Sequence, residues 1–283
     1  MAISVPLVGS GELAAHLRDE DVLVCDCRFV DDAEGSRARY ADGHIPGAIH
    51  VDWLEDLSAA DTSVTTFLPD REEARDQLGR LGVTQQKAVV AYSDSGNLYA
   101  SRLWHVLVEY GHDRVALLDG GIEKWQAEGR PLETGSVDPM PALFEPRDGS
   151  MRAIGAHEIL RRLKDADLCL VDVRGLAEFS GEQLRAARGG HIPGAVHWPW
   201  EVNLRPDGTL CDPTEIRARA EAAGLLPEQE LVTYCQGGVR AAHAALALRI
   251  AGYRRVRIYD GSWAEWGNDP ALPIEEAVTP AAA

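Results

Sequence analysis

The chain has 283 residues, of which 45% are hydrophobic and 26% are charged, a composition typical of one large or two ordinary globular domains. The formal net charge of −17 argues against nucleic acid or an anionic membrane as a partner, because phosphate groups need surplus Lys and Arg. No apolar run approaches the roughly 20 residues of a membrane span, and we expect no secretory leader. Five cysteines in no framework spacing indicate a reducing compartment, so we expect a cytoplasmic protein.

Taken in order, the chain is an internal duplication. Each half carries a short apolar strand ending in Asp-x-Arg, a Gly-His-Ile-Pro-Gly-Ala segment, a second strand ending in Tyr, and a third strand followed by Asp-Gly and a tryptophan. These blocks are Val22–Arg28, Gly43–His50, Val89–Tyr92 and Arg114–Gly120 with Trp125 in the first half, and Leu168–Arg174, Gly190–His197, Leu231–Tyr234 and Arg255–Gly261 with Trp266 in the second. Four matching blocks in one order predict two copies of a single domain.

Each copy alternates short β-branched strands with helical stretches, which predicts an α/β fold with a parallel sheet flanked by helices. The helices after the Tyr92 and Tyr234 strands are expected to end at Gly111 and Gly252. Residues 131–150 hold four prolines and two glycines and are interpreted as a semi-extended linker. The predicted domains are therefore residues 1–130 and 151–283.

One cysteine stands at a strand-to-helix junction. Cys235 follows the Leu231–Tyr234 strand and precedes a Gly-bearing turn and an Ala/Leu-rich helix that starts near Arg240. The backbone N–H groups of the turn and the first helical turn, with the helix dipole behind them, form a cradle for an anion. Such positions lower a thiol pKa from about 8.5 to roughly 3.5–7.5, and Arg240 adds a fixed positive charge. The pattern predicts a nucleophilic cysteine, whereas the plain alternative is a buried structural thiol.

The first copy has no cysteine at the matching place. Ser93 stands there and is followed by Asp94, whose carboxylate would repel an anionic substrate. The first copy is therefore expected to be a catalytically inactive support domain.

Other polar residues are expected to be structural. His44 and His191 occur in both copies, with and without the cysteine, which favours a hydrogen bond to backbone at a turn over a catalytic role. Asp26 and Asp172 end matching strands and are interpreted as loop anchors. No metal site is predicted.

These motifs resemble the tandem-domain rhodanese family, which contains thiosulfate and 3-mercaptopyruvate sulfurtransferases. The most specific segments are His-Ile-Pro-Gly-Ala in both halves, Cys235–Arg240 and Tyr259–Gly267. The resemblance covers nearly the whole chain and implies an inactive N-terminal domain and a C-terminal domain with a persulfide-forming cysteine. It implies transfer of sulfur from a small anionic donor, through Cys235, to cyanide or a thiol, without a metal or organic cofactor.

The chain departs from the family pattern at positions that bind the sulfur donor. Gly237 stands where mercaptopyruvate enzymes have serine. Glu178 stands where both the thiosulfate and the mercaptopyruvate enzymes have arginine. We expect the residues of the Cys235 loop to bind the donor with help from two arginines on the loop that follows Glu178. The predicted donor site is Gln236, Gly237, Gly238, Val239, Arg240, Arg185 and Arg188. Because the mercaptopyruvate-specific residues are the missing ones, thiosulfate is the favoured donor.

Three alternatives remain open on sequence grounds. A cysteine phosphatase of the dual-specificity type has one more residue between cysteine and arginine than the four found here. A persulfide carrier that delivers sulfur to a partner protein would share the same loop. Arg240 itself would be unavailable to a donor if it paired along the helix with an acidic residue such as Glu265.

Overall fold

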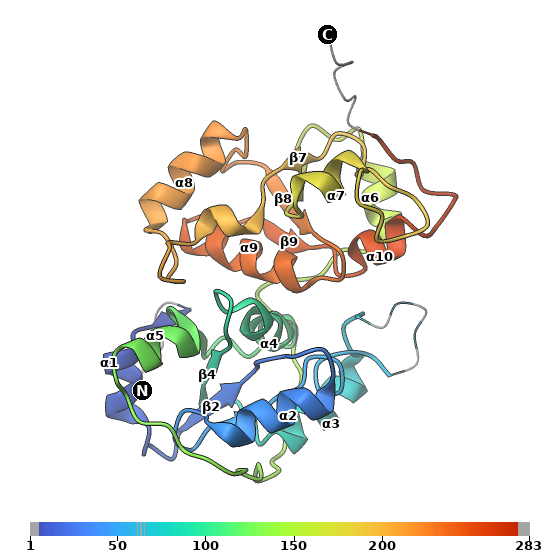
Figure 1. The fold of residues 1–283 in the computed structure, drawn as a ribbon. Helices are drawn as coiled ribbons and strands as arrows, with labels where there is room; N and C mark the ends of the chain where they lie inside the picture. The colour runs from blue at the N-terminus through green and yellow to red at the C-terminus, as the bar shows by residue number, and fades with distance from the viewer. Residues whose placement is uncertain (1–5, 61, 63, 65, 277–283) are drawn as a thin grey trace. The chain divides into compact units, whose positions relative to one another are not determined.

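The computed structural model describes residues 6–60, 62, 64 and 66–276, which fall into two compact units (Figure 1). The first unit contains Met1–Met151 and Leu204–Leu210, and the second contains Arg152–Asn203 and Cys211–Ala283. In the part of the chain so described, no helix has both the length and the apolar character needed to cross a bilayer.

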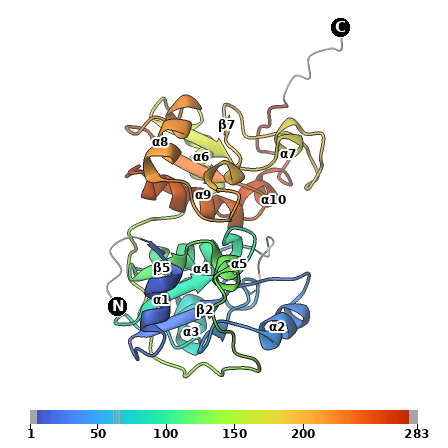
Figure 2. The same ribbon diagram turned by 60° about the vertical axis from the view of Figure 1, so that its left-hand side comes forward.

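The first unit is a parallel sheet of five strands in the order β1-β5-β4-β2-β3. Figures 1 and 2 both place α4 on one side of this sheet and α3 on the other. Its elements are β1 (Leu7–Val8), α1 (Ser10–His16), β2 (Val22–Asp26), α2 (Ala33–Asp42), β3 (Ile49–His50), α3 (Arg71–Arg80), β4 (Ala88–Tyr92), α4 (Leu98–Glu109), β5 (Val115–Leu118) and α5 (Gly121–Ala127).

The second unit has a parallel sheet of four strands in the order β7-β6-β8-β9, with α9 packed on β8 and β9. Its elements are α6 (Ala156–Arg162), β6 (Leu168–Asp172), α7 (Leu176–Ser180), β7 (Val196–His197), the 3-10 helix η1 (Trp200–Asn203), α8 (Pro213–Ala222), β8 (Glu230–Tyr234), α9 (Val239–Ile250), β9 (Val256–Ile258) and α10 (Ser262–Trp266). Both sheets confirm the predicted α/β fold.

The central strands are apolar along their whole length because helices cover both faces of a parallel sheet. Every residue of β4 and β5 is buried. The helices end where the sequence predicts, since Gly111 and Gly252 adopt φ of 78° and 92° just past α4 and α9. Glycine takes this left-handed conformation without a Cβ penalty.

Residues 131–150, interpreted as a linker, run along the first unit. The Ala142 N–H donates to Gly79 O at 2.8 Å, and the Arg147 N–H donates to Tyr110 O at 3.0 Å. Phe144 is fully buried. These contacts fix the segment on the unit that precedes it.

The duplication extends to the packing. Trp125 and Trp266 are buried in the cores of their own units, and their indole N–H groups donate to Pro131 O and Pro273 O at 2.9 and 2.7 Å. A buried indole needs such a partner for its N–H. The tryptophan after each Asp-Gly turn therefore closes each core in the same way.

Candidate functional site

Cys235 lies at the carboxyl end of β8, where the chain turns into α9, and its side chain is buried. Its own N–H donates to the hydroxyl of Ser262 at 3.1 Å, and its carbonyl accepts from the Trp263 N–H at 3.0 Å. The next carbonyl, of Gln236, accepts from the Ala264 N–H at 2.9 Å. Helix α10 thus holds the base of the loop in place from the side.

The turn itself is built on Gly238, which adopts φ +84° at the N-cap of α9. The first intrahelical bond runs from the Ala242 N–H to Gly238 O at 2.9 Å. Helix geometry therefore leaves the N–H groups of Val239, Arg240 and Ala241 without a carbonyl four residues back. These N–H groups lie at the positive end of a helix of 12 residues, next to Cys235, where a helix attracts an anion.

One alternative from the sequence was that Arg240 pairs with Glu265, and the structure shows a different partner. Its guanidinium bonds both oxygens of Glu178 on α7, from Nη1 to Oε2 at 2.6 Å and from Nη2 to Oε1 at 2.9 Å. Glu265 instead accepts from the Tyr259 hydroxyl at 2.7 Å. The cation of the Cys235 loop is thus held by a buried carboxylate.

The titration of the pair follows from this geometry. Burial alone would raise the pKa of the Glu178 carboxyl, but the hydrogen bonds and charge of Arg240 outweigh burial and lower that pKa. Burial would likewise lower the pKa of Arg240, but the Glu178 hydrogen bond and the negative charges of Cys235 and Glu178 raise it.

The remaining predicted arginines differ in their surroundings. The Arg185 side chain is 50% exposed, with Nη1 at 3.8 Å from Glu178 Oε1, and its carbonyl accepts from the Gln236 amide at 2.9 Å. Four of the five guanidinium N–H donors of Arg188 serve backbone carbonyls, which leaves one for the donor-binding role that the sequence predicts. Those carbonyls belong to Gly267, Leu272, Trp266 and Asp269. Arg188 holds the segment after α10 and is left out of the site that we propose below.

A buried ion pair supports the loop from the neighbouring strand. Asp172 at the end of β6 binds Arg174 with a closest N–O distance of 2.6 Å, and Arg174 also donates to Gly190 O at 2.7 Å. The Arg174 guanidinium lies 4.5 Å from the ring centroid of Trp263. The backbone N–H of Trp263 is the one that donates to the Cys235 carbonyl. Asp172 is therefore the loop anchor that the sequence predicts, through a pair with Arg174 that sequence reasoning missed.

The same pair recurs in the first unit. Asp26 binds Arg28 at 2.6 Å, and Arg28 donates to Gly43 O at 2.7 Å. The repeated Asp-x-Arg spacing was the sequence signal for both pairs.

Where the second unit has the Cys235 loop, the first unit has a loop occupied by its own polar contacts. The Ser93 hydroxyl donates to Asp94 O at 3.2 Å, and the Ser93 N–H donates to Asn97 Oδ1 at 2.8 Å. The Asp94 carboxylate pairs with Arg39 at 2.5 Å. Ser93 therefore lies beside a carboxylate that is already neutralised rather than beside a general base.

Burial disfavours the thiolate form of three other cysteines. Burial raises the pKa of Cys25 and Cys27 well above that of a free thiol, and it raises the pKa of Cys169 to about 11. A thiol with such a pKa carries little of the nucleophilic thiolate near neutral pH. All five cysteines of the chain are free.

The two motif histidines are structural, as predicted. The Nδ1 atoms of His44 and His191 lie 3.0 Å from the carbonyl oxygens of Tyr40 and Phe179. Both rings also stack on an aromatic neighbour, with centroids 4.1 Å apart for Tyr40–His44 and 3.8 Å apart for Phe179–His191.

Sequence reasoning did not assign a role to Ser262. Its hydroxyl accepts from the Cys235 N–H while donating to Tyr259 O at 2.8 Å, and its backbone adopts φ +51°. Its place inside the Tyr259–Gly267 motif was the available signal. A left-handed φ is uncommon for a non-glycine residue and is maintained only where surrounding contacts demand it.

Comparison with known proteins finds the Rhodanese-like domain twice, at residues 10–128 and 155–269. A thiosulfate sulfurtransferase of Azotobacter vinelandii is 37% identical over 96% of this chain and 98% of its own length. The sulfur carrier protein TtuD of Thermus thermophilus is 37% identical over 95% of each chain. A probable 3-mercaptopyruvate sulfurtransferase of Pseudomonas aeruginosa is 38% identical over 96% of this chain and 98% of its own.

Among solved structures, an anaerobic ergothioneine biosynthesis enzyme from Chlorobium limicola, in complex with trimethyl histidine, matches with a TM-score of 0.85. It is 27% identical, and the match covers 97% of this chain and 71% of that one.

Proposed function

Because this chain belongs to the rhodanese-like family, we propose that it is a sulfurtransferase that moves a sulfane sulfur from thiosulfate, through a persulfide on Cys235, to cyanide or a thiol. The observation that carries the proposal is the position of Cys235 at the head of α9, where its loop is anchored by α10 and flanked by backbone donors. Loops of this kind stabilise a thiolate and the negative charge that develops on it.

The first half-reaction uses only the cysteine and the cradle. The Cys235 thiolate attacks the outer sulfur of thiosulfate, the S–S bond of the donor breaks, and its electron pair leaves with sulfite. Cys235 is left as a persulfide anion, whose charge the N–H groups of Val239, Arg240 and Ala241 are placed to stabilise. Preorganised donors need no rearrangement during this step.

The second half-reaction regenerates the thiolate. Cyanide attacks the outer persulfide sulfur, the S–S bond breaks again, and thiocyanate leaves while the electron pair returns to Cys235. A thiol acceptor takes the same sulfur and becomes a persulfide itself. A reducing compartment such as the cytoplasm would keep Cys235 in the thiol form that this cycle needs.

Thiosulfate is the proposed donor because the residue two places after Cys235 is Gly237, which has no side chain to assist mercaptopyruvate. The P. aeruginosa relative is named for 3-mercaptopyruvate, so that compound is the alternative donor. Gln236, Gly237, Gly238, Val239, Arg240 and Arg185 form the proposed donor site.

A second candidate function is persulfide delivery to a protein acceptor. Leu176 and Leu184 are 66% and 65% exposed; Leu176 lies two positions before Glu178, and Leu184 directly precedes Arg185. Exposed leucines beside a reactive site suit contact with another protein, and TtuD is named as a sulfur carrier.

We assign catalysis to the second unit alone, with the linker at residues 131–150 retained as the proposed domain boundary. The support is that Ser93 in the first unit replaces the cysteine and is bonded within its own loop.

The proposed function is tested by mass spectrometry and steady-state kinetics on the full chain. Thiosulfate without acceptor is expected to add one sulfur atom to the peptide that contains Cys235, and cyanide is expected to remove it. Side-by-side kinetics with thiosulfate and 3-mercaptopyruvate then give the preferred donor. A protein that gains no sulfur from either donor contradicts the proposal. One that passes sulfur to a protein thiol but not to cyanide supports the carrier function instead.

A further inference from the structure

The donor site contains a carboxylate that the proposed reaction does not need. The Glu178 side chain is 6% exposed, and both of its oxygens bond Arg240. Its Oε2 also accepts from the Gly175 N–H at 3.3 Å, at the N-terminus of α7. A buried negative charge beside a site that receives an anion works against the first step, so its presence calls for a functional explanation.

The charged side chains around the loop leave only a small positive surplus. Arg240 and Arg185 carry two positive charges, and Glu178 lies within ion-pair distance of both and cancels one of them. Asp172 and Arg174 cancel each other as a buried pair. These five side chains leave a single net positive charge for the donor.

The orientation of Arg240 strengthens this effect. A guanidinium offers five N–H donors, and the two-point contact with Glu178 uses one from each terminal nitrogen. The two terminal nitrogens of Arg240, which could otherwise bind a tetrahedral oxyanion together, therefore face α7. The donor is left the backbone N–H groups, which carry partial charges only, and the N–H donors of Arg240 that Glu178 does not use.

Resting on the proposed function, we propose that Glu178 is a specificity-determining residue that limits the charge a sulfur donor can carry, favouring singly charged donors over doubly charged thiosulfate. A donor such as a thiosulfonate or an organic persulfide then reacts more readily, relative to thiosulfate, than it would at a site without this carboxylate. Glu178 acts through Arg240 and is a positioning residue rather than a catalytic one.

Two donors separate charge from chemistry. Methanethiosulfonate carries the same sulfane sulfur on the same tetrahedral sulfonyl centre as thiosulfate, with a methyl group in place of one charged oxygen. With either donor Cys235 takes the outer sulfur, the S–S bond breaks, and the electron pair leaves on sulfite or on methanesulfinate. The ratio of the two kcat/KM values therefore measures how the site responds to one extra negative charge.

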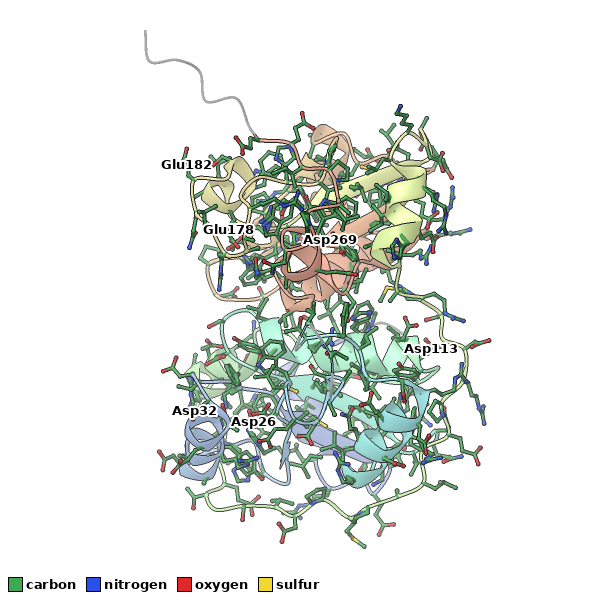
Figure 3. All side chains as sticks on the ribbon, turned by 90° about the vertical axis from the view of Figure 1, so that its right-hand side faces the viewer. Asp26, Asp32, Asp113, Glu178, Glu182 and Asp269 are labelled. Carbon is green, nitrogen blue, oxygen red and sulfur yellow. The ribbon has the colours of Figure 1, made fainter. Side chains whose placement is uncertain are left out.

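The experiment measures this ratio, thiosulfate over methanethiosulfonate, with cyanide as acceptor for the full chain and three variants. Glu178→Gln keeps an oxygen for the Gly175 N–H and removes the charge. It is expected to raise the ratio about tenfold, chiefly through a lower KM for thiosulfate, as expected for a unit charge within several ångströms of the donor. Glu182→Gln is the matched control, because it makes the same change at an exposed position on the same segment and leaves the ratio unchanged. Figure 3 shows both carboxylates on α7 and the loop after it.

Arg185→Gln keeps the test decisive if Glu178→Gln fails to fold. It removes an exposed positive charge from the same cluster and is expected to lower the ratio by about two- to threefold, since solvent screens that charge. Wild-type transfer with an unchanged ratio in every folded variant overturns this inference alone. No transfer from either donor in the wild type overturns the proposed function, and this inference with it.

Discussion

The guanidinium of Arg240 and the carboxylate of Glu178 form a two-point ion pair, with N–O distances of 2.6 and 2.9 Å, between the helix that follows Cys235 and the short helix α7. The pair joins the Cys235 loop to the segment that carries Arg185. Its two residues lie 62 positions apart in the sequence. Stability and donor binding are therefore coupled at this one contact.

A double-mutant cycle separates the two effects. Arg240→Ala leaves Glu178 buried without its partner, so we expect a loss of about 3 kcal/mol in the free energy of unfolding. It also lowers kcat/KM for thiosulfate by roughly 10- to 100-fold, because a charge-assisted contact is lost. The double variant Glu178→Gln/Arg240→Ala recovers part of the stability and only part of the activity, because the repelling carboxylate is removed but the contact of Arg240 with the donor stays lost. Denaturant unfolding and donor kinetics measure the two, and full recovery of activity in the double variant would contradict an interaction of Arg240 with the donor.

The pair also predicts a dependence of stability on pH. The pKa of Glu178 is lower in the folded protein than its ordinary value of about 4.3, so the carboxylate contributes stability above that pH. This contribution is lost as the pH falls through the lowered pKa. Wild type is therefore expected to unfold at a higher temperature than Glu178→Gln at pH 7, with the two midpoints converging below about pH 4. A gap that stays constant across this range would show that the charge of Glu178 is not what stabilises the fold.

Cys235→Ser is expected to abolish sulfur transfer from either donor without unfolding the protein, because a serine hydroxyl cannot form the persulfide. Alanine at Cys25, Cys27, Cys169 or Cys211 is expected to leave kcat within about twofold of wild type, after any loss of folded protein is corrected for. Thiocyanate formation measures both. If Cys235→Ser retained even a tenth of wild-type activity, the persulfide mechanism would be wrong.

Ser93→Ala and Asp94→Ala test whether the first unit is catalytically inactive. The Ser93 hydroxyl is bonded within its own loop, and the Asp94 carboxylate pairs with a partly exposed Arg39. We expect kcat/KM for thiosulfate to stay within about twofold of wild type, with a loss of at most about 1 kcal/mol of stability for Asp94→Ala. A large loss of turnover in a folded Ser93→Ala protein would give the first unit a part in the chemistry.

The repeated Asp–Arg pair provides a comparison within one chain. Asp172→Asn and Asp26→Asn each remove the charge from a buried pair, and each is expected to cost about 3 kcal/mol of stability. Only Asp172→Asn should also lower kcat/KM. Its partner Arg174 lies over the ring of Trp263, and the backbone N–H of Trp263 donates to the Cys235 carbonyl. If kcat/KM, measured on the folded fraction, fell equally in both variants, Asp172 would not act on Cys235 through Arg174 and Trp263.

The duplication, the parallel α/β fold and the position of Cys235 between strand and helix could all be predicted from the sequence. These properties depend on local patterns: strand and helix periodicity, glycines at Gly111, Gly238 and Gly252, and motifs repeated in the same order. Backbone conformation at such positions follows from neighbours in the chain, so the carboxyl end of β8 and the head of α9 were predictable.

The tertiary structure decided what the charged side chains do. The sequence pointed to Arg240, Arg185 and Arg188 as donor-binding cations, yet Arg240 is held by Glu178, and Arg188 serves backbone carbonyls after α10. A guanidinium on a long, flexible side chain takes the acceptor that folding brings closest, and that acceptor often comes from a distant segment. Sequence spacing identifies the loop that we propose as the sulfur-binding site, whereas the charge left for a donor depends on contacts that form only when α7 and α9 meet.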